Sequence, residues 1–202
     1  MERLSRQLHF IAEAGRLKGV QRQTMLTELA RQENSAEHSW HLTVLALTLA
    51  EYAPPGTDLG RVVAMLALHD IVEVDAGDLS AYAPAPEQAR QQAAELAAAD
   101  RLFGLLPPDQ AGGLRQLWDE FEERASLEAR FARALDRLQP MLENVKAGGG
   151  TWCAPGVTAD QVLTKVALIE DGSPQLGQFA RDLIGEAVRT GILASGSGPV
   201  GT

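Results

Sequence analysis

The stretch from Arg61 to Asp78, RVVAMLALHDIVEVDAGD, limits what this chain can fold into more than any other part of the sequence. The eleven residues that follow Arg61 are apolar except for His69 and Asp70. A helix of this composition is buried nearly all round, and an ionised carboxylate in an apolar interior is destabilising by several kcal/mol unless it is paired or binds a metal. The fold must therefore provide a partner for the His69-Asp70 pair.

Further carboxylates follow this pair, because Glu73, Asp75 and Asp78 lie around Gly77, where we expect the helix over residues 58–74 to end. Acidic side chains at the C-terminal end of a helix are disfavoured by roughly 0.3–1 kcal/mol each. A bound cation would stabilise both the buried pair and the acidic helix end. The stretch therefore predicts a functional site that holds a cation.

The composition is that of an ordinary globular chain. Of its 202 residues, 45% are hydrophobic and 22% are charged, and no apolar run approaches the ~20 residues that span a bilayer. We expect one domain over residues 1–193 and a disordered tail over residues 194–202. The single cysteine, Cys153, excludes an internal disulfide and fits a reducing cytoplasm.

The charge balance limits the class of partner. A net charge of −9 argues against a nucleic-acid polymer, because affinity for such polymers comes largely from Lys and Arg side chains that neutralise phosphates. A small phosphorylated ligand is compatible with this charge, since one or two basic residues and a metal ion would offset the acidity.

Helical periodicity recurs along the whole chain. No convincing alternation of apolar and polar residues interrupts it, so the sequence predicts an all-α architecture without strands. The expected helices cover residues 3–17, 34–52, 58–74, 86–103, 110–124, 126–146, 157–169 and 174–193.

The second of these helices contains two histidines. Asn34 and Glu37 have the spacing of a capping box, which predicts the start of the helix. His38 and His41 are three residues apart, so they could share one helix face and bind a metal together. The alternative is that either histidine only packs against neighbours such as Trp40.

Asp136 lies beside the apolar stripe of the helix over residues 126–146. Pro140 cannot donate a hydrogen bond to the Asp136 carbonyl, so we expect a bend that aims the aspartate inward. The alternative is an aspartate on the surface that pairs with Arg133 or Arg137. Arg22 is an ordinary surface arginine or, because a planar guanidinium is the usual ligand of an anion, a candidate anion-binding residue.

The order of a histidine, a His-Asp pair and a later aspartate resembles the HD-domain metal-dependent phosphohydrolases. Three segments are similar to the signatures of the 5′-deoxynucleotidase branch, namely AEHSWH at 36–41, HDIVEVDAGD at 69–78 and ARFARALDRLQPML at 129–142. The resemblance covers roughly residues 1–193. It implies an HD-domain helical bundle, a divalent metal cofactor, a small nucleotide substrate and a homodimer.

The resemblance also implies roles for single residues. Glu73 matches the acidic residue that acts with the metal-bound water, and Asp78 matches a carboxylate on the substrate side. Arg22 is the candidate for the arginine that holds the phosphate, although Gln23 stands where the bacterial enzymes have an aromatic residue. The implied metal ligands are His38, His69, Asp70 and Asp136.

Two imidazoles and two carboxylates suit Co²⁺, Mn²⁺, Mg²⁺, Fe²⁺, Ni²⁺ or Zn²⁺. Together with the resemblance to the 5′-deoxynucleotidase branch, this donor set predicts hydrolysis of (deoxy)nucleoside 5′-monophosphates to nucleoside and phosphate. Three alternatives stay open. The chain could hydrolyse another nucleotide, such as a guanosine polyphosphate or a cyclic nucleotide, although the sequence shows no obvious second basic pocket. It could be a catalytically silent module that senses nucleotide or metal, or a helical interaction protein whose histidines are core residues.

Overall fold

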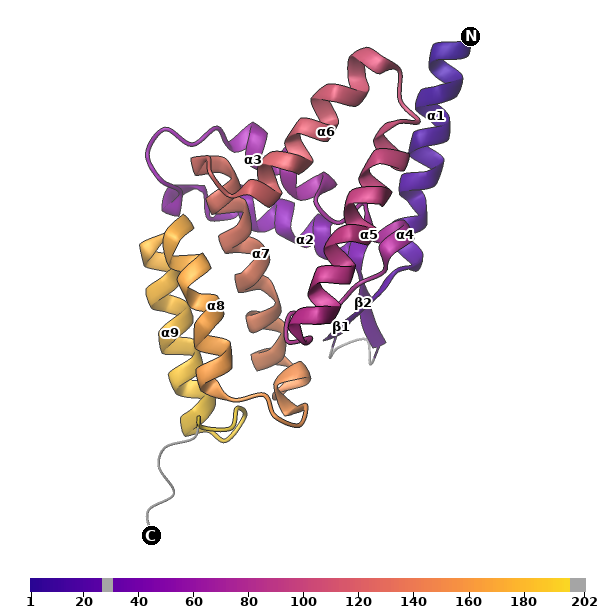
Figure 1. The fold of residues 1–202 in the computed structure, drawn as a ribbon. Coiled ribbons are helices and arrows are strands. Elements are labelled where there is room, and N and C mark those ends of the chain that lie inside the picture. Colours follow the sequence, from indigo (N-terminus) through magenta and orange to yellow (C-terminus); the bar gives the residue numbers. More distant parts are fainter. Residues whose placement is uncertain (27–30, 197–202) are drawn as a thin grey trace.

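Helices form the body of the molecule, which confirms the all-α prediction (Figure 1). The computed structural model describes residues 1–26 and 31–196. Its α-helices are α1 (Glu2–Ala14), α2 (Ser35–Thr48), α3 (Leu59–Leu68), α4 (Glu73–Ala76), α5 (Ala85–Phe103), α6 (Pro108–Glu123), α7 (Leu127–Lys146), α8 (Ala159–Gly172) and α9 (Pro174–Arg189). The 3₁₀ helices are η1 (Gly15–Gly19), η3 (Ala50–Tyr52) and η4 (Gly150–Cys153).

Helix α7 is central to the fold and contacts α2, α3, α6, α8 and α9. In Figure 1 the α8–α9 pair lies on one side of α7, and α5 and α1 lie on the other. The apolar stripe of α7, which includes Phe131, Leu135 and Leu138, is buried in one cluster with Leu42 of α2 and Met65 of α3. This burial holds α2, α3 and α7 against one another.

A second apolar cluster fixes the segment that follows α3. Ile71 and Val72 are buried there against Phe103 of α5 and Trp118 of α6. The indole Nε1 of Trp118 also donates a hydrogen bond of 3.0 Å to the carbonyl oxygen of His69. The backbone around the His69-Asp70 pair is therefore held by packing and by a hydrogen bond.

The expected helix over residues 58–74 is not continuous. Helix α3 ends at Leu68, and α4 begins at Glu73 after a tight turn. In the turn the backbone N–H of Ile71 bonds to the carbonyl of Leu68, and that of Glu73 bonds to the carbonyl of Asp70. These bonds span three residues rather than four, so the chain turns tightly just after the metal-ligand candidates.

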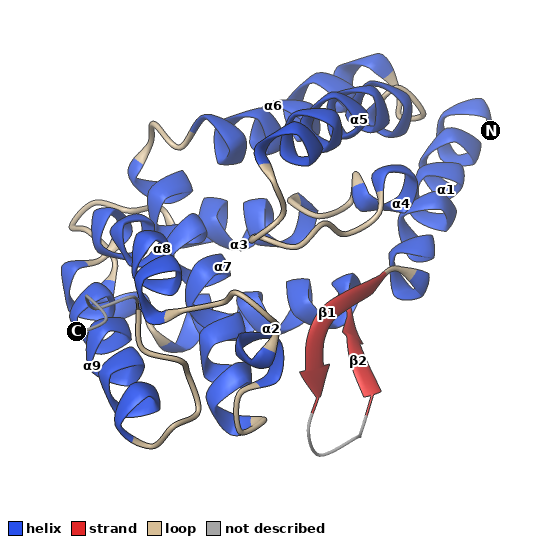
Figure 2. Ribbon diagram, turned by 60° about the horizontal axis from the view of Figure 1, so that its bottom comes forward, coloured by secondary structure: helices blue, strands red, loops and turns tan. Residues whose placement is uncertain are grey.

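The expectation that the chain has no strands was wrong. Strands β1 (Gln21–Leu26) and β2 (Arg31–Asn34) form an antiparallel pair beside the helices (Figure 2). The paired residues are Gln21 with Asn34, Met25 with Gln32 and Leu26 with Arg31. The buried positions of these strands are Thr24 and Glu33, which are polar, so the apolar alternation that signals a strand is missing.

Pro140 lies inside α7, and the helix continues to Lys146. Asp136 is only 5% exposed, so the aspartate does lie in the interior. The predicted bend stays a prediction.

Two further expectations concern the C-terminal tail and the presence of a membrane-spanning helix. Residues 197–202 of the predicted disordered tail lie outside the described residues. The part of the tail that is described begins with Ala194, whose carbonyl accepts a hydrogen bond of 2.9 Å from the backbone N–H of Ala159. Across residues 1–26 and 31–196, no helix has the length and apolar character to cross a membrane.

The capping box predicted at the start of α2 is present. Asn34 Oδ1 accepts a hydrogen bond of 3.0 Å from the N–H of Glu37, and Glu37 Oε2 accepts one of 3.1 Å from the N–H of Asn34. We expect Asn34→Ala to lower the free energy of unfolding by about 1 kcal/mol, because an N–H of the first turn loses its acceptor. Urea unfolding followed by circular dichroism measures this change. Asn34→Asp keeps the acceptor and should lose much less, and equal losses in both variants would contradict the capping role.

Candidate metal centre

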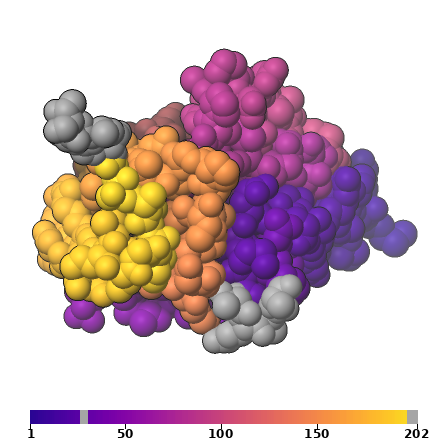
Figure 3. All heavy atoms as spheres, turned by 90° about the horizontal axis from the view of Figure 1, so that it is seen from below, coloured from indigo at the N-terminus to yellow at the C-terminus, as the bar shows by residue number. Residues whose placement is uncertain are grey.

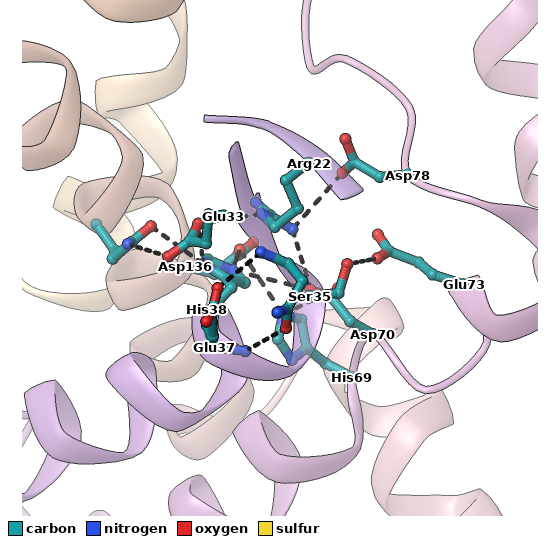
Figure 4. Close-up of polar contacts among 12 residues, drawn as sticks. Arg22, Glu33, Ser35, Glu37, His38, His69, Asp70, Glu73, Asp78 and Asp136 are labelled. Atoms are coloured by element: carbon teal, nitrogen blue, oxygen red, sulfur yellow. Dashed lines mark hydrogen bonds and ion pairs between the residues drawn. The ribbon is translucent and has the colours of Figure 1, made fainter. Parts of the chain in front are cut away.

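Three side chains from separate elements converge at the centre of the fold (Figure 4). They are His38 of α2, His69 at the end of α3 and Asp136 of α7, and one potential ligand atom from each lies within 4.8 Å of the other two. His38 Nε2 is 3.2 Å and His69 Nε2 is 3.8 Å from Asp136 Oδ1. All three residues are buried. This group could therefore hold a metal ion.

Asp70, the fourth predicted ligand, lies directly beside this group. Its Oδ1 is 3.0 Å from His69 Nε2, and its Oδ2 is 3.9 Å from His38 Nε2. Its Oδ2 also accepts a hydrogen bond of 3.1 Å from Arg22 Nη1. The four side chains thus lie within reach of one another, and their role as ligands stays a prediction.

The hydrogen bonds of the two imidazoles leave both Nε2 atoms directed at carboxylates. Gln139 Oε1 lies 3.0 Å from His38 Nδ1, and the carbonyl oxygen of Leu66 lies 3.0 Å from His69 Nδ1. Both oxygens are acceptors, so in a neutral imidazole the proton lies on Nδ1 and the lone pair on Nε2. His69 Nε2 is buried without a hydrogen-bond partner among the described residues.

This arrangement fits a cation. The lone pair of a neutral His38 Nε2 faces Asp136 Oδ1, and His69 Nε2 faces Asp70 Oδ1, so each pair is favourable only where positive charge, from a proton or a metal ion, lies between the two atoms. Burial and the nearby charge of Arg22 lower the pKa of His38 to about 4, so this imidazole is neutral at pH 7. Burial disfavours the charged form of His69, but the nearby carboxylates of Asp70 and Asp136 together outweigh burial and raise the pKa of His69 above its ordinary value. The donor set therefore suits a divalent metal ion.

Two polar residues that sequence analysis missed orient this group. Gln139 of α7 accepts from His38, and its amide Nε2 donates a hydrogen bond of 2.9 Å to Glu33 Oε1. Glu33 is only 1% exposed, and burial raises its pKa to about 7 despite the charge of Arg22. The spacing of Asp136 and Gln139 was the available signal, because residues three apart share a helix face.

Glu73, the predicted catalytic acid or base, is the first residue of α4 and is buried. Ser35 Oγ, from the first turn of α2, donates a hydrogen bond of 2.6 Å to Glu73 Oε2. Burial, together with the negative charge of Asp70, raises the pKa of Glu73 to about 10. In the metal-free protein Glu73 therefore carries a proton at neutral pH, although the charge of Arg22 opposes the rise in its pKa.

Arg22 of β1 lies among carboxylates on the other side of Asp70. Its Nη1 is 3.6 Å from Asp78 Oδ1, and its Nε is 3.4 Å from Glu33 Oε2. Burial disfavours its charge, but Asp70 and Asp78 outweigh this effect and raise the pKa of Arg22. Gly77 positions Asp78 through a backbone φ of 73°, a conformation that glycine adopts readily. Arg22 and Asp78 thus lie where sequence analysis expected them, beside the candidate metal centre (Figure 4).

His41 lies apart from the three converging residues. Its Nδ1 is 3.2 Å from Gln139 Nε2 and 3.8 Å from Glu143 Oε1. Its side chain therefore contacts the residue that orients His38, and His41 is not part of the group of three that could hold a metal ion.

The candidate centre opens into a cavity of about 590 Å³. Arg22, Glu73 and Asp78 line it near the centre, and Tyr82 and Trp152 line it farther away. A volume of this size accommodates a small organic molecule.

The fold and the site together define an all-α protein with a buried candidate centre for a divalent metal. The family model described as HD domain matches residues 14–177, and the chain belongs to this family, as sequence analysis predicted.

Several known proteins are similar to this chain. A crystal structure described as a predicted metal-dependent phosphohydrolase from Magnetospirillum magnetotacticum is 51% identical, with a TM-score of 0.91 and a match over 96% of each chain. The 5′-deoxynucleotidase HDDC2 of Homo sapiens is 28% identical over 137 residues, which are 67% of this chain and 65% of the human protein. That of Xenopus laevis is 30% identical over 139 residues, 67% of this chain and 66% of the frog protein. The chain therefore spans about two thirds of the length of these curated relatives.

The geometry predicts one divalent ion per chain at this centre. We expect His69→Ala to abolish stoichiometric binding, because it removes a nitrogen donor from a buried site. Gln139→Ala should weaken binding by about 10–100-fold, because His38 loses the group that orients it. Elemental analysis after equilibrium dialysis against Mn²⁺ measures both effects. His9→Ala, on the exposed face of α1, is the matched control, and equal metal content in His9→Ala and His69→Ala would contradict the site.

The raised pKa of Glu73 predicts a pH dependence of stability in the metal-free protein. The pKa in the folded chain, about 10, exceeds the ordinary value of 4.5, so the folded state binds the extra proton between these values. The stability from protonated Glu73 is complete below pH 4.5 and is lost as pH rises towards 10. Thermal melts with a chelator, from about pH 5 to pH 9, should show a steeper fall in Tm for wild type than for Glu73→Gln. The exposed Glu87→Gln should behave like wild type, and parallel curves for Glu73→Gln and wild type would refute the assignment.

Proposed function

We propose that this chain is a metal-dependent phosphohydrolase that hydrolyses (deoxy)nucleoside 5′-monophosphates to nucleoside and phosphate. The convergence of His38, His69 and Asp136 beside Asp70 carries the proposal, because it joins a buried mixed nitrogen and oxygen donor set to an open cavity. Membership of the HD-domain family supports it, as do the names of the similar proteins.

His38, His69, Asp70 and Asp136 would hold the divalent ion. Such an ion supplies positive charge that lowers the pKa of a water molecule and offsets the charge of the phosphoryl group. The residues of the chain provide the remaining functions, which are to bind the phosphate and to move protons.

Arg22 binds the phosphoryl oxygens. Its guanidinium has five N–H donors, and the buried carboxylates of Asp70 and Asp78 keep it charged and oriented towards the centre. Asp78 lines the cavity beyond Arg22 and faces the sugar side of the substrate.

Glu73 moves the proton. In its protonated form it gives a proton to O5′ of the nucleotide as the P–O5′ bond breaks, and it takes one from the water whose oxygen adds to phosphorus. The products are then a nucleoside with a free 5′-hydroxyl and inorganic phosphate, with Glu73 protonated again. Ser35 holds Oε2 of Glu73 during this exchange through its hydrogen bond of 2.6 Å.

Three further expectations from the sequence belong to this proposal. We propose that residues 1–193 form a single domain, with α7 in contact with the helices on both sides of it. A homodimer and a cytoplasmic location stay predictions.

The activity test is phosphate release from a panel of 2′-deoxynucleoside and nucleoside 5′-monophosphates by the metal-loaded protein. We expect Asp70→Ala to abolish turnover and Glu73→Gln to lower kcat by about 10²–10⁴-fold, the usual contribution of a general acid or base. Asp75→Asn is the matched control on α4, because Asp75 pairs with Arg101 at 2.9 Å and does not line the cavity. Equal phosphate release from wild type and Asp70→Ala would refute the site. Stoichiometric metal without turnover of any nucleotide would instead indicate a sensing module.

A further inference from the structure

The cavity beside the candidate metal centre has a basic wall that the sequence did not predict. It comes from three elements: the C-terminal cap of α6, helix α7 and helix α8. The cationic side chains that line it are Arg124, Arg133, Arg137 and Lys165. The sequence shows no obvious second basic pocket, and these four cations line the same cavity as the candidate metal centre.

Two carboxylates face this wall. Arg133 Nη2 is 2.8 Å from Glu122 Oε1, and Arg133 Nη1 is 3.3 Å from Asp136 Oδ2. Arg137 Nη2 is 3.1 Å from the same Oδ2 of Asp136. Arg133 thus pairs with both carboxylates, whereas Arg137 pairs with Asp136 alone. Asp136 is also a proposed metal ligand.

Arg124 and Lys165 leave the wall with an excess of positive charge. Within the described part of the chain, neither forms an ion pair with a carboxylate. Lys165 Nζ instead lies 6.0 Å from the centroid of the Tyr82 ring. Burial and the charge of Arg137 lower the pKa of Lys165, and burial and the charge of Arg133 lower that of Arg124. Like charges held together in a cavity are unfavourable unless an anion binds between them.

The two arginines of α7 are held firmly and keep unused donors. The Arg133 guanidinium lies 4.0 Å from the centroid of the Phe121 ring, and its side chain is 8% exposed. The Nε atoms of Arg133 and Arg137 are buried without a hydrogen-bond partner among the described residues. Arg137 uses Nη2 on Asp136 and its Nε is buried, so Nη1 is the nitrogen of this guanidinium that remains available to a ligand in the cavity.

We propose that Arg124, Arg133, Arg137 and Lys165 form an anion subsite that takes a second phosphoryl group of the nucleotide. The first phosphoryl group lies at the metal centre and Arg22, so the inference rests on the proposed function for that half of the ligand. The ligand class is a nucleoside that carries two phosphoryl groups, joined as a 5′-diphosphate or separate as a 3′,5′-bisphosphate.

The geometry places the two subsites next to each other. Asp136 lies between them, with Oδ1 towards His38 and Oδ2 towards Arg133 and Arg137. The shared cavity of about 590 Å³ lies within the usual range for ligand pockets. Its lining includes residues of β1, of the segment before α5 and of α8, and Figure 3 shows the indigo, magenta and orange parts of the chain adjoining on one face. A ligand with two anionic groups can therefore contact both subsites at once.

Calorimetric binding tests this inference independently of turnover. Full-length Glu73→Gln protein, loaded with Mn²⁺, is titrated with the 5′-monophosphate, the 5′-diphosphate and the 3′,5′-bisphosphate of one nucleoside. We expect one of the two doubly phosphorylated ligands to bind at least about tenfold more tightly than the monophosphate, as one charge-assisted hydrogen bond would provide. The ligand that shows this advantage identifies whether the second phosphoryl group is adjacent or separate.

Substitutions in the basic wall distinguish binding of the second phosphoryl group at the subsite from attraction of its negative charge to the metal ion. In the Glu73→Gln protein, a further Lys165→Gln or Arg124→Gln substitution should lower the affinity for the doubly phosphorylated ligand by about tenfold. The affinity for the monophosphate should stay unchanged. Neither residue pairs with a proposed metal ligand, so the metal content should stay the same. Arg130→Gln is the matched control on α7, because Arg130 pairs with Asp171 at 3.6 Å and does not line the cavity.

The outcomes are distinct for the two proposals. Equal loss of affinity for mono- and diphosphorylated ligands would overturn the inference, since the wall would then hold the reacting phosphoryl group. An advantage that survives both substitutions would overturn it as well. If wild type hydrolyses monophosphates but the advantage is absent, the subsite fails and the proposed function stands. If the substitutions remove the advantage but wild type hydrolyses no nucleotide, the subsite stands and the proposed function fails.

Discussion

The structure depends on two buried imidazoles whose Nε2 atoms face carboxylate oxygens. Because Gln139 Oε1 and the Leu66 carbonyl accept hydrogen bonds from the Nδ1 atoms, each Nε2 faces a carboxylate oxygen and needs positive charge, from a proton or a metal ion, between itself and that oxygen. Such a cluster is unfavourable by itself, so the packing around it must hold it in place. The apolar clusters on both sides of α3 and the bond from Trp118 to the His69 carbonyl provide that support. Positive charge at the centre would remove the repulsion between these side chains.

Negative charge at this centre is balanced in two different ways. Arg22 neutralises the Oδ2 side of Asp70, whereas Asp70 Oδ1 faces His69. Glu73 forms no ion pair within residues 1–26 and 31–196, and its carboxyl retains a proton at neutral pH despite the charge of Arg22. A cation near Asp70 would reduce the negative charge that raises the pKa of Glu73, and would therefore make its proton easier to transfer. Metal binding and proton transfer are in this way coupled through one carboxylate.

Most of the fold and the core of the candidate site could be predicted from the sequence, since charged residues within apolar helical stripes are conspicuous. His69 and Asp70 interrupt such a stripe, and Asp136 lies directly beside one. The hairpin was missed because its buried positions carry Thr24 and Glu33, and the helix break was missed because the apolar run continues through the turn. Gln139 is neutral, so it does not stand out in the sequence as a buried charge does.

The basic wall could not be predicted, because net charge averages over the chain while the fold gathers cations from α6, α7 and α8.

Asp136 links the two halves of the cavity. Asp136 Oδ1 faces His38 and Oδ2 faces two guanidinium groups, so a cation bound at Oδ1 would divide the negative charge of this carboxylate with Arg133 and Arg137. A metal ion at the histidines therefore leaves Arg133 and Arg137 less neutralised and more attractive to an anion. By thermodynamic reciprocity, an anion on the basic wall must strengthen metal binding by the same factor. In a chain of net charge −9, this coupling would concentrate positive charge at the cavity beside the candidate metal centre.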